Sequence, residues 1–205
     1  MAKWSNSDEA YYIIEQIGAN ATGVITTKQI EDAGIYRGMI RKFVEDGRLI
    51  KEAKGLYSLA SEFPDEYFVL QKRSKKMIFS YGAALYLWGM SDRVPHNLDV
   101  TVPQGFNSSR IKKDNPNTRF HYVKKDKWEI GITEINTVMG NKVFLYDKER
   151  CICDLIMVKK EMDKQIYIQA IKEYFNGEHD LRKIISYAKA FGIEEKVRDY
   201  MDVLT

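Results

Sequence analysis

Apolar residues recur every three or four positions over residues 10–17, which predicts an amphipathic helix near the N-terminus. We expect this helix to begin at Ser7, whose hydroxyl can cap it, and to end before Gly18. Asp8 and Glu9 would lie in its first turn, where the helix dipole favours acids. Its apolar side most simply packs beneath the segment that follows.

Two further short helices are predicted close together. Thr26 or Thr27 can cap the first, because a threonine hydroxyl accepts from amide groups that the first turn leaves unpaired. Gly34 can end it in the left-handed conformation that glycine adopts readily. The second helix follows over residues 36–46, and Gly47 ends it. Two helices at this spacing are typical of a helix-turn-helix.

The second helix divides into an apolar and a polar side at helical spacing. The residues expected to pack inwards are Tyr36, Ile40, Phe43 and Val44. The residues expected to face outwards are Arg37, Gly38, Arg41, Lys42 and Glu45. After this helix, residues 49–51 and 56–59 predict two strands joined through residues 53–55. A hairpin at this place is the wing of a winged helix-turn-helix.

The outward side has the chemistry of a DNA-reading helix. A helix fits the major groove of B-DNA, where an arginine guanidinium can bind guanine through two hydrogen bonds. Arg37 and Arg41 stand one turn apart, and Gly38 beside them adds no side chain that would hold the helix away from DNA. The residues that we expect to contact DNA are Thr27, Lys28, Tyr36, Arg37, Arg41, Lys42, Arg48, Lys51 and Lys54. A solvated helix face is the alternative interpretation, because lysine and arginine are exposed in most proteins.

Local charge supports the DNA interpretation. Residues 37–54 carry six basic and three acidic side chains, whereas residues 1–36 carry two basic and five acidic ones. The net charge of the whole chain is only +3, so the hypothesis of DNA binding rests on this local distribution of charge. We assign no function to two further basic stretches, residues 72–76 and 110–127. For the second, a solvated strand edge kept from pairing by lysines is at least as good an explanation.

The pattern of residues changes after residue 60. Residues 61–64 mark a boundary, and Pro64 suits the first position of a helix over residues 65–71. We therefore expect a winged helix-turn-helix domain over residues 1–60 and an α/β effector domain over residues 61–205.

In the second domain, strand patterns come first and helical patterns last. Strands are predicted over residues 77–79, 98–102, 118–123, 130–135 and 142–146, with a helix capped by Ser80 after the first of them. Helices are predicted over residues 148–162, with Asp147 as the cap, and over residues 165–175, 180–191 and 194–204. The predicted fold class is α+β: an N-terminal winged helix-turn-helix domain, then a mixed α/β domain with a central sheet and a helical C-terminal end.

Composition restricts the class of protein further. With 205 residues, of which 44% are hydrophobic and 12% aromatic, the chain can bury a core and is not a disordered protein. No apolar stretch has the length of a signal-peptide core or of a bilayer span, so we expect a cytoplasmic protein. Cys151 and Cys153 stand two positions apart on a predicted helix and point in different directions, which predicts buried thiols. The three histidines share no ligand spacing, and we expect no metal and no cofactor.

Four segments together resemble the AbiEi family of antitoxins from bacterial abortive-infection toxin–antitoxin operons. The segments are residues 26–59, 79–95, 98–103 and 143–156. The most telling motifs are ALYLWGMSD at residues 84–92 and YDKER at residues 146–150, followed by Asp154 and Leu155. The resemblance covers nearly the whole chain.

The resemblance implies an autorepressor whose N-terminal winged helix binds repeats in the double-stranded DNA of its own promoter. It also implies a C-terminal domain that counteracts a toxin of the nucleotidyltransferase class. This would occur in the type IV manner, in which a stable toxin–antitoxin complex is not required, and would serve phage resistance. Such a protein is compatible with a monomer in solution that binds cooperatively on DNA. No family motif assigns the antitoxic activity to individual residues.

A nucleotidyltransferase site is the enzymatic alternative. Such sites carry Gly-Ser and then a strand with two acids one residue apart, because both acids must point to one side to hold metal ions. Here Met90 separates Gly89 from Ser91, and Thr101 stands where the second acid after Asp99 would be. A hydroxyl does not replace a carboxylate charge, so we expect no catalytic residues and no enzyme. Asp99 is then expected to be a surface or turn-bonding acid.

A one-component regulator with a small-molecule-sensing C-terminal domain is the other alternative. Aromatic residues that could line a ligand pocket are Tyr81, Tyr86, Trp88, Phe120, Tyr122 and Trp128. Aromatic residues at such positions are more often ordinary core.

Overall fold

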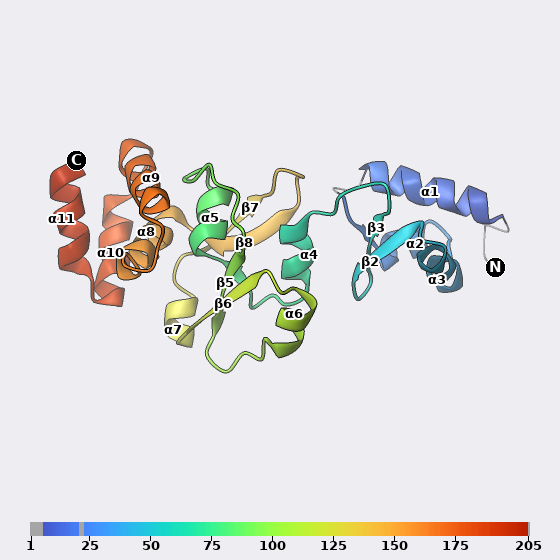
Figure 1. Cartoon of the computed structure of the whole chain (residues 1–205), viewed down its shortest axis with the longest axis horizontal. Coiled ribbons are helices and arrows are strands. Elements are labelled where there is room, and N and C mark those ends of the chain that lie inside the picture. Colours follow the sequence, from blue (N-terminus) through green and yellow to red (C-terminus); the bar gives the residue numbers. More distant parts are fainter. Residues whose placement is uncertain (1–5, 21–22, 205) are drawn as a thin grey trace. The chain divides into compact units, whose positions relative to one another are not determined.

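The computed structural model describes residues 6–20 and 23–204. The chain divides into two compact units, whose elements are shown in Figure 1. The first unit comprises Met1–Arg73 with Asn136–Val143, and the second comprises Ser74–Ile135 with Phe144–Thr205. The α+β class predicted from the sequence is confirmed, because helices and two separate sheets are present. The first compact unit continues beyond residue 60, where the sequence pattern changes.

The first unit packs helices against a three-stranded sheet. Its elements are α1 (Ser7–Asn20), β1 (Ile25–Thr26), α2 (Thr27–Asp32), α3 (Arg37–Glu45), β2 (Leu49–Ala53), β3 (Leu56–Leu59) and α4 (Glu66–Lys72). The strand order is β1-β3-β2, and both neighbouring pairs are antiparallel. The buried core is formed by Ala10, Ile14, Ile25, Ile30, Ile35, Met39, Ile40, Phe43, Leu49 and Leu59. The apolar side of α1 therefore does pack beneath α2 and α3.

Helix α1 differs from the prediction at both ends. Its cap is Asn6 rather than Ser7, since the Asn6 side chain accepts from the amide of Asp8 at 3.0 Å. Gly18 lies inside the helix instead of ending it. A Cβ at Gly18 would approach Leu59 Cδ1 to 2.6 Å, so the missing side chain serves close packing of α1 against β3.

Asp65 joins α4 to the turn between the last two strands. It caps α4 by accepting from the amide of Phe68 at 3.1 Å. Its other carboxylate oxygen accepts from Thr137 Oγ1 at 2.5 Å and from Asn141 Nδ2 at 2.9 Å. The prediction that Pro64 opens this helix is wrong, because Asp65 holds the cap position and Pro64 precedes it.

The second unit contains a five-stranded mixed sheet followed by helices. Its elements are β4 (Ile78–Phe79), α5 (Tyr81–Leu87), β5 (Leu98–Pro103), α6 (Ser109–Asp114), β6 (Thr118–Val123), α7 (Lys125–Trp128), β7 (Ile132–Asn136), β8 (Lys142–Tyr146), α8 (Lys148–Met157), α9 (Lys164–Asn176), α10 (Leu181–Phe191) and α11 (Glu194–Leu204). The strand order is β6-β5-β4-β8-β7. Strand β4 is antiparallel to β5 and parallel to β8, and β5 is parallel to β6. Figure 1 shows α8 to α11 grouped together in orange and red.

Two short helices of this unit were not predicted. Helices α6 and α7 have the sequences SRIKKD and KDKW, which are too short and too polar to show a helical period. Helix α8 is shorter than predicted and ends at Met157, although Asp147 caps it as expected by accepting from the amide of Arg150 at 2.8 Å. Cys151 and Cys153 are both buried in α8, which confirms the predicted buried thiols.

A buried arginine organises the core of the second unit. Arg150 of α8 is only 1% exposed, and its Nε donates to Asp154 Oδ1 at 2.8 Å. Its Nη1 donates to the carbonyl of Lys127 at 2.6 Å and to that of Ile130 at 2.8 Å. The guanidinium carbon lies 4.1 Å from the ring centroid of Tyr146 and 4.3 Å from that of Phe191. One side chain thus connects α8 with α7, the segment before β7, the end of β8 and α10.

The carboxylate partner of this arginine is equally enclosed. Burial raises the pKa of Asp154 to about 6, against the opposing attraction of Arg150. Gly131, at φ +81°, allows the chain to pass the arginine, since a Cβ there would lie 2.7 Å from Arg150 Cβ. The pair is therefore held by packing from several directions.

None of the helices in the described part of the chain is both long and apolar enough to cross a membrane.

Replacing Arg150 by Met should lower the free energy of unfolding by about 3–5 kcal/mol, because Asp154 is left as an uncompensated buried charge. Denaturant unfolding of the full chain, followed by circular dichroism, measures this change. Combining Arg150→Met with Asp154→Leu should recover part of the loss, since no buried charge then remains.

Arg198→Met is the matched control for this prediction. Arg198 forms an i,i+4 pair with Glu194 at 2.7 Å, but the arginine side chain is exposed and that of the glutamate is partly exposed. An exposed pair of this kind contributes less than about 1 kcal/mol. Equal losses for Arg150→Met and Arg198→Met would contradict the role assigned to the buried pair.

Candidate nucleic-acid interface

Helix α2 and the turn after it are set by local hydrogen bonds. Thr26 caps α2, its hydroxyl accepting from the amide of Gln29 at 3.2 Å, while the Gln29 side chain accepts from the amide of Thr26 at 2.8 Å. This reciprocal pair is a capping box, and the Thr-x-x-Gln spacing is its sequence signal. Gly34 then takes φ +85°, which lets α3 follow after a short turn. The predicted cap and the predicted turn glycine are both confirmed.

Helix α3 has one buried side and one exposed side. Met39, Ile40 and Phe43 are buried, and Val44 is partly buried against the same core. Tyr36 was expected among the packed residues, which is wrong, because it is the residue before the helix and is exposed. Met39 takes the buried position instead.

The exposed side of α3 presents the two predicted arginines. The side chain of Arg37 is 79% exposed and that of Arg41 is 83% exposed. Each is held by an acid of the same unit: Arg37 Nε lies 2.5 Å from Glu31 Oε1, and Arg41 Nε lies 2.8 Å from Glu45 Oε1. The hydrogen bond with Glu31 raises the pKa of Arg37 above its usual value. Exposed pairs of this kind are weak, so both guanidinium groups can exchange partners at little cost.

Tyr36 and Gly38 lie against each other on the exposed side. A Cβ at Gly38 would meet Tyr36 Cε2 at 2.5 Å, so the tyrosine ring occupies the space that a side chain at residue 38 would need. The ring thus adds an aromatic hydroxyl to the surface beside Arg37, Arg41 and the exposed Lys42.

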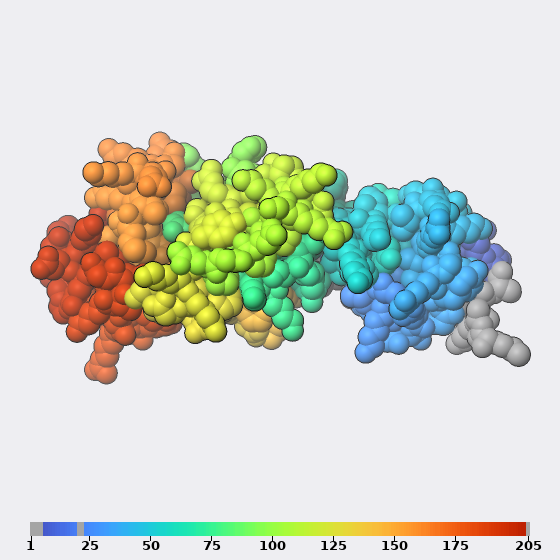
Figure 2. Space-filling model, turned by 90° about the horizontal axis from the view of Figure 1, so that it is seen from below, coloured from blue at the N-terminus to red at the C-terminus, as the bar shows by residue number. Residues whose placement is uncertain are grey.

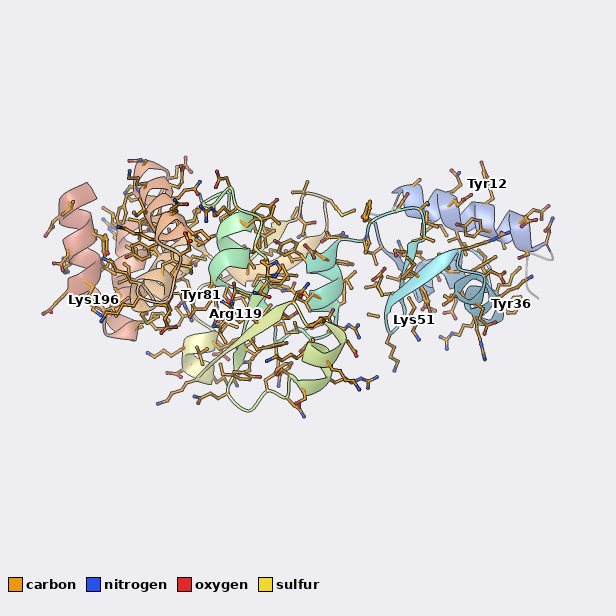
Figure 3. All side chains as sticks on the ribbon, in the orientation of Figure 1. Tyr12, Tyr36, Lys51, Tyr81, Arg119 and Lys196 are labelled. Carbon is orange, nitrogen blue, oxygen red and sulfur yellow. The ribbon has the colours of Figure 1, made fainter. Side chains whose placement is uncertain are left out.

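The β2–β3 hairpin places further charge next to this surface. Lys51 and Lys54 are exposed on it. The hairpin turn is fixed to the start of α2, because the amide of Thr27 donates to the carbonyl of Gly55 at 2.9 Å. Lys28 is exposed in the first turn of α2. In Figure 3, Tyr36 and Lys51 lie on one side of the first unit and Tyr12 of α1 on the other, and Figure 2 faces the side of Tyr36 and Lys51.

Arg48 differs from the other predicted contacts. Its Nη1 lies 3.0 Å from Asp8 Oδ1, and its guanidinium carbon lies 4.9 Å from the ring centroid of Tyr11. Arg48 therefore fastens the start of the hairpin to α1. No pattern along the chain indicated this contact, which joins residues 40 positions apart.

The other basic stretches are partly engaged within their own units. Lys72 lies 4.5 Å from the ring centroid of Phe68, and Arg73 donates to the carbonyl of Glu52 at 3.1 Å. In the second stretch, Lys127 lies over the ring of Phe191 at 5.4 Å. These contacts favour a structural role for the three residues.

The residues considered for a nucleotidyltransferase site differ from the expectation in their burial and in their hydrogen-bond partners. Asp99 is not a surface acid: it is 7% exposed, and its Oδ1 lies 2.8 Å from His121 Nε2 on the neighbouring strand. Thr101 is buried and donates to Ser80 Oγ at 2.9 Å. Ser80 is the residue before α5, as predicted, but its side chain makes no capping hydrogen bond and accepts from Thr101 instead.

Among the aromatic residues considered for a ligand pocket, the two tryptophans have structural partners. Trp88 Nε1 donates to the carbonyl of Tyr146 at 2.8 Å, and Trp128 Nε1 donates to the carbonyl of Thr101 at 3.3 Å. Tyr81 lines a cavity, beside Asp99 and His121.

Comparison with known proteins finds one family similarity, in the N-terminal part of the chain. Residues 19–60 match the family model described as a transcriptional regulator, AbiEi antitoxin. No protein with a curated description matches the chain. The crystal structure of the RV2827C protein from Mycobacterium tuberculosis is similar over 88% of this chain and 71% of its own, with a TM-score of 0.63 and 12% sequence identity. At this identity the similarity concerns the fold alone.

The matched residues include the cap of α2, the turn at Gly34, the exposed arginines of α3 and the β2–β3 hairpin. Residues 19–60 are therefore similar to the AbiEi antitoxin transcriptional regulators, the family that the chain was expected to resemble.

Proposed function

We propose that the protein is a cytoplasmic antitoxin that represses its own toxin–antitoxin operon by binding promoter DNA through α2, α3 and the β2–β3 hairpin. The family match over residues 19–60 supports the regulatory role. The observation that carries the proposal is the surface of α3, on which Arg37 and Arg41 stand one turn apart, strongly exposed, on a helix anchored by its opposite side.

In this proposal the first unit acts as a winged helix-turn-helix. Helix α3 enters the major groove, and Arg37 and Arg41 exchange Glu31 and Glu45 for the acceptor edges of guanine. Lys51 and Lys54 on the hairpin, together with Lys28 and the Thr27 hydroxyl, contact phosphates and set the position of the helix. Lys42 and Tyr36 extend the same surface, whereas Arg48 acts mainly by holding the hairpin on α1.

The second unit carries the antitoxic activity in this proposal. The toxin it counteracts is of the nucleotidyltransferase class, and the opposition is of type IV, without a stable complex between the two proteins. The DNA sites are promoter repeats, on which monomers bind cooperatively. We assign no catalytic residue to this activity.

A ligand-sensing regulator is the second candidate function. It is favoured by one observation, the cavity in the second unit that Tyr81, Asp99 and His121 line. Rescue of growth from the toxin separates the two functions, because a sensor alone would give ligand-dependent DNA binding without rescue.

Arg37→Ala and Arg41→Ala should each weaken promoter binding by about 1–3 kcal/mol, the value of one bidentate contact to a base, and leave the fold intact. Gel-shift titration of the promoter fragment measures the affinity, and circular dichroism checks the fold. Arg198→Ala is the control, since it removes the same charge from an exposed helix pair in the second unit. Unchanged affinity for both α3 variants would remove them from the interface.

Binding should weaken as salt rises, because phosphate contacts release counterions. Lys51→Gln should lower the slope of log affinity against log salt by about 1 and reduce affinity for all DNA sequences alike. A slope equal to that of the unsubstituted protein would show that Lys51 does not contact a phosphate.

The double variant Arg37→Ala/Arg41→Ala should lose repression and keep its antitoxic effect, because both residues lie in the first unit. A promoter–reporter fusion measures repression, and co-expression with the neighbouring toxin measures growth rescue. Loss of both activities in a variant that folds normally would argue against a division of functions between the units.

A further inference from the structure

A cavity of about 280 Å³ lies in the second unit. Its walls come from the start of α5, from β5 and β6, and from the connection between α8 and α9. The polar and aromatic side chains that matter here are Tyr81, Asp99, Arg119, His121, Glu161 and Asp163. The volume is near the lower end of small-molecule sites.

A carboxylate and an imidazole are paired in the wall of this cavity. Asp99 on β5 and His121 on β6 are 2.8 Å apart, and both line the space. The parallel register of β5 and β6 sets Asp99 opposite Arg119 and Thr101 opposite His121. Pairing of β5 with β6 therefore brings Asp99 close to Arg119 and His121, although about twenty residues of sequence separate the acid from them.

The backbone at the start of α5 is strained beside this pair. Tyr81 has φ +45°, the only positive φ of a non-glycine residue in the described part of the chain. Strained non-glycine residues cluster at functional sites, where the surrounding structure must enforce them. The strain places the Tyr81 ring 4.2 Å from the His121 ring, measured between centroids.

The next residue permits the backbone to approach the acid closely. A Cβ at Gly82 would lie 3.2 Å from Asp99 Oδ2, closer than an ordinary contact. The cavity thus combines an aromatic ring, that of Tyr81, with a carboxylate acceptor, that of Asp99.

Arg119 supplies the positive charge of the site. Its side chain is 62% exposed, and its Nε stands 4.0 Å from Asp99 Oδ1, too far for a hydrogen bond. Figure 3 shows Arg119 close to Tyr81. A guanidinium in this position can bind a phosphate without breaking a strong internal contact.

The charges of the remaining lining residues limit how many phosphates can enter. Glu161 and Asp163 are acidic, and Asp163 already accepts from the amides of Gln165 and Ile166 as the cap of α9. Asp163 also lies 3.6 Å from Arg93 Nη1, and Asp99 lies 2.8 Å from His121 Nε2, so two of the three lining acids have a basic side chain as a partner. The three carboxylates still repel a triphosphate more strongly than a ligand with a single phosphate.

We propose that this cavity binds a nucleoside monophosphate, either free or as the phosphorylated end of a single-stranded RNA. The phosphate binds Arg119, the ribose hydroxyls donate to Asp99, and the base stacks on Tyr81. Glu161 accepts from amino groups of the base. This site is independent of DNA binding by the first unit.

Titration of the full ¹⁵N-labelled chain, followed by amide chemical shifts, tests the proposal. The probes are AMP, GMP, CMP and UMP, with ATP and inorganic phosphate as comparisons. We expect at least one monophosphate to bind with a dissociation constant of about 1 mM or below, and at least about tenfold more tightly than ATP or phosphate. A 5′-phosphorylated RNA tetranucleotide separates the two sources, and tighter binding than the monophosphate assigns the site to an RNA end.

Arg119→Ala should weaken this binding at least about tenfold. Because the side chain is largely exposed, this variant is expected to fold, and Asp99→Asn provides a second test of the ribose contact. Arg110→Ala is the control, an exposed arginine on α6 that does not line the cavity. The proposal is overturned if no monophosphate or RNA end binds, if phosphate alone binds equally well, or if Arg110→Ala and Arg119→Ala weaken binding alike.

Discussion

The buried guanidinium of Arg150 is the interaction on which the second unit depends. A charge enclosed in a protein interior is stable only beside an opposite charge and with its donors satisfied. Asp154 provides the charge, the carbonyls of residues 127 and 130 accept the remaining hydrogen bonds, and two aromatic rings close the space. The sheet and the C-terminal helices are thereby fixed to each other, which also fixes the walls of the cavity in the same unit.

The same kind of ion pair has a different role in the first unit. Arg37 and Arg41 are paired with glutamates, yet these pairs stand in water, where each is weak and easily exchanged. The low cost of leaving these acids is what would make the two arginines available to bases in the proposed complex with DNA. Burial, and not the type of residue, separates an arginine that holds the fold from one that can exchange its partner.

The proposed antitoxic function and the proposed site in the second unit both involve nucleotides. A toxin of the nucleotidyltransferase class uses nucleotides, and a nucleotide site in the second unit would give antitoxin and toxin a common ligand. Opposition through a shared ligand requires no stable contact between the proteins, which agrees with a type IV relationship. The proposed DNA surface is built from other residues, and they lie on the first unit, which has its own core.

The sequence alone determined the features that depend on neighbours within a few residues. The cap at Thr26, the turn at Gly34 and the arginine side of α3 follow from local hydrogen bonds and helical period, and they are present as predicted. Only the tertiary structure decided that Asp99 is buried against His121 and that Arg48 is held by α1. Those contacts depend on strand register and on packing between distant segments, which a pattern read along the chain does not contain.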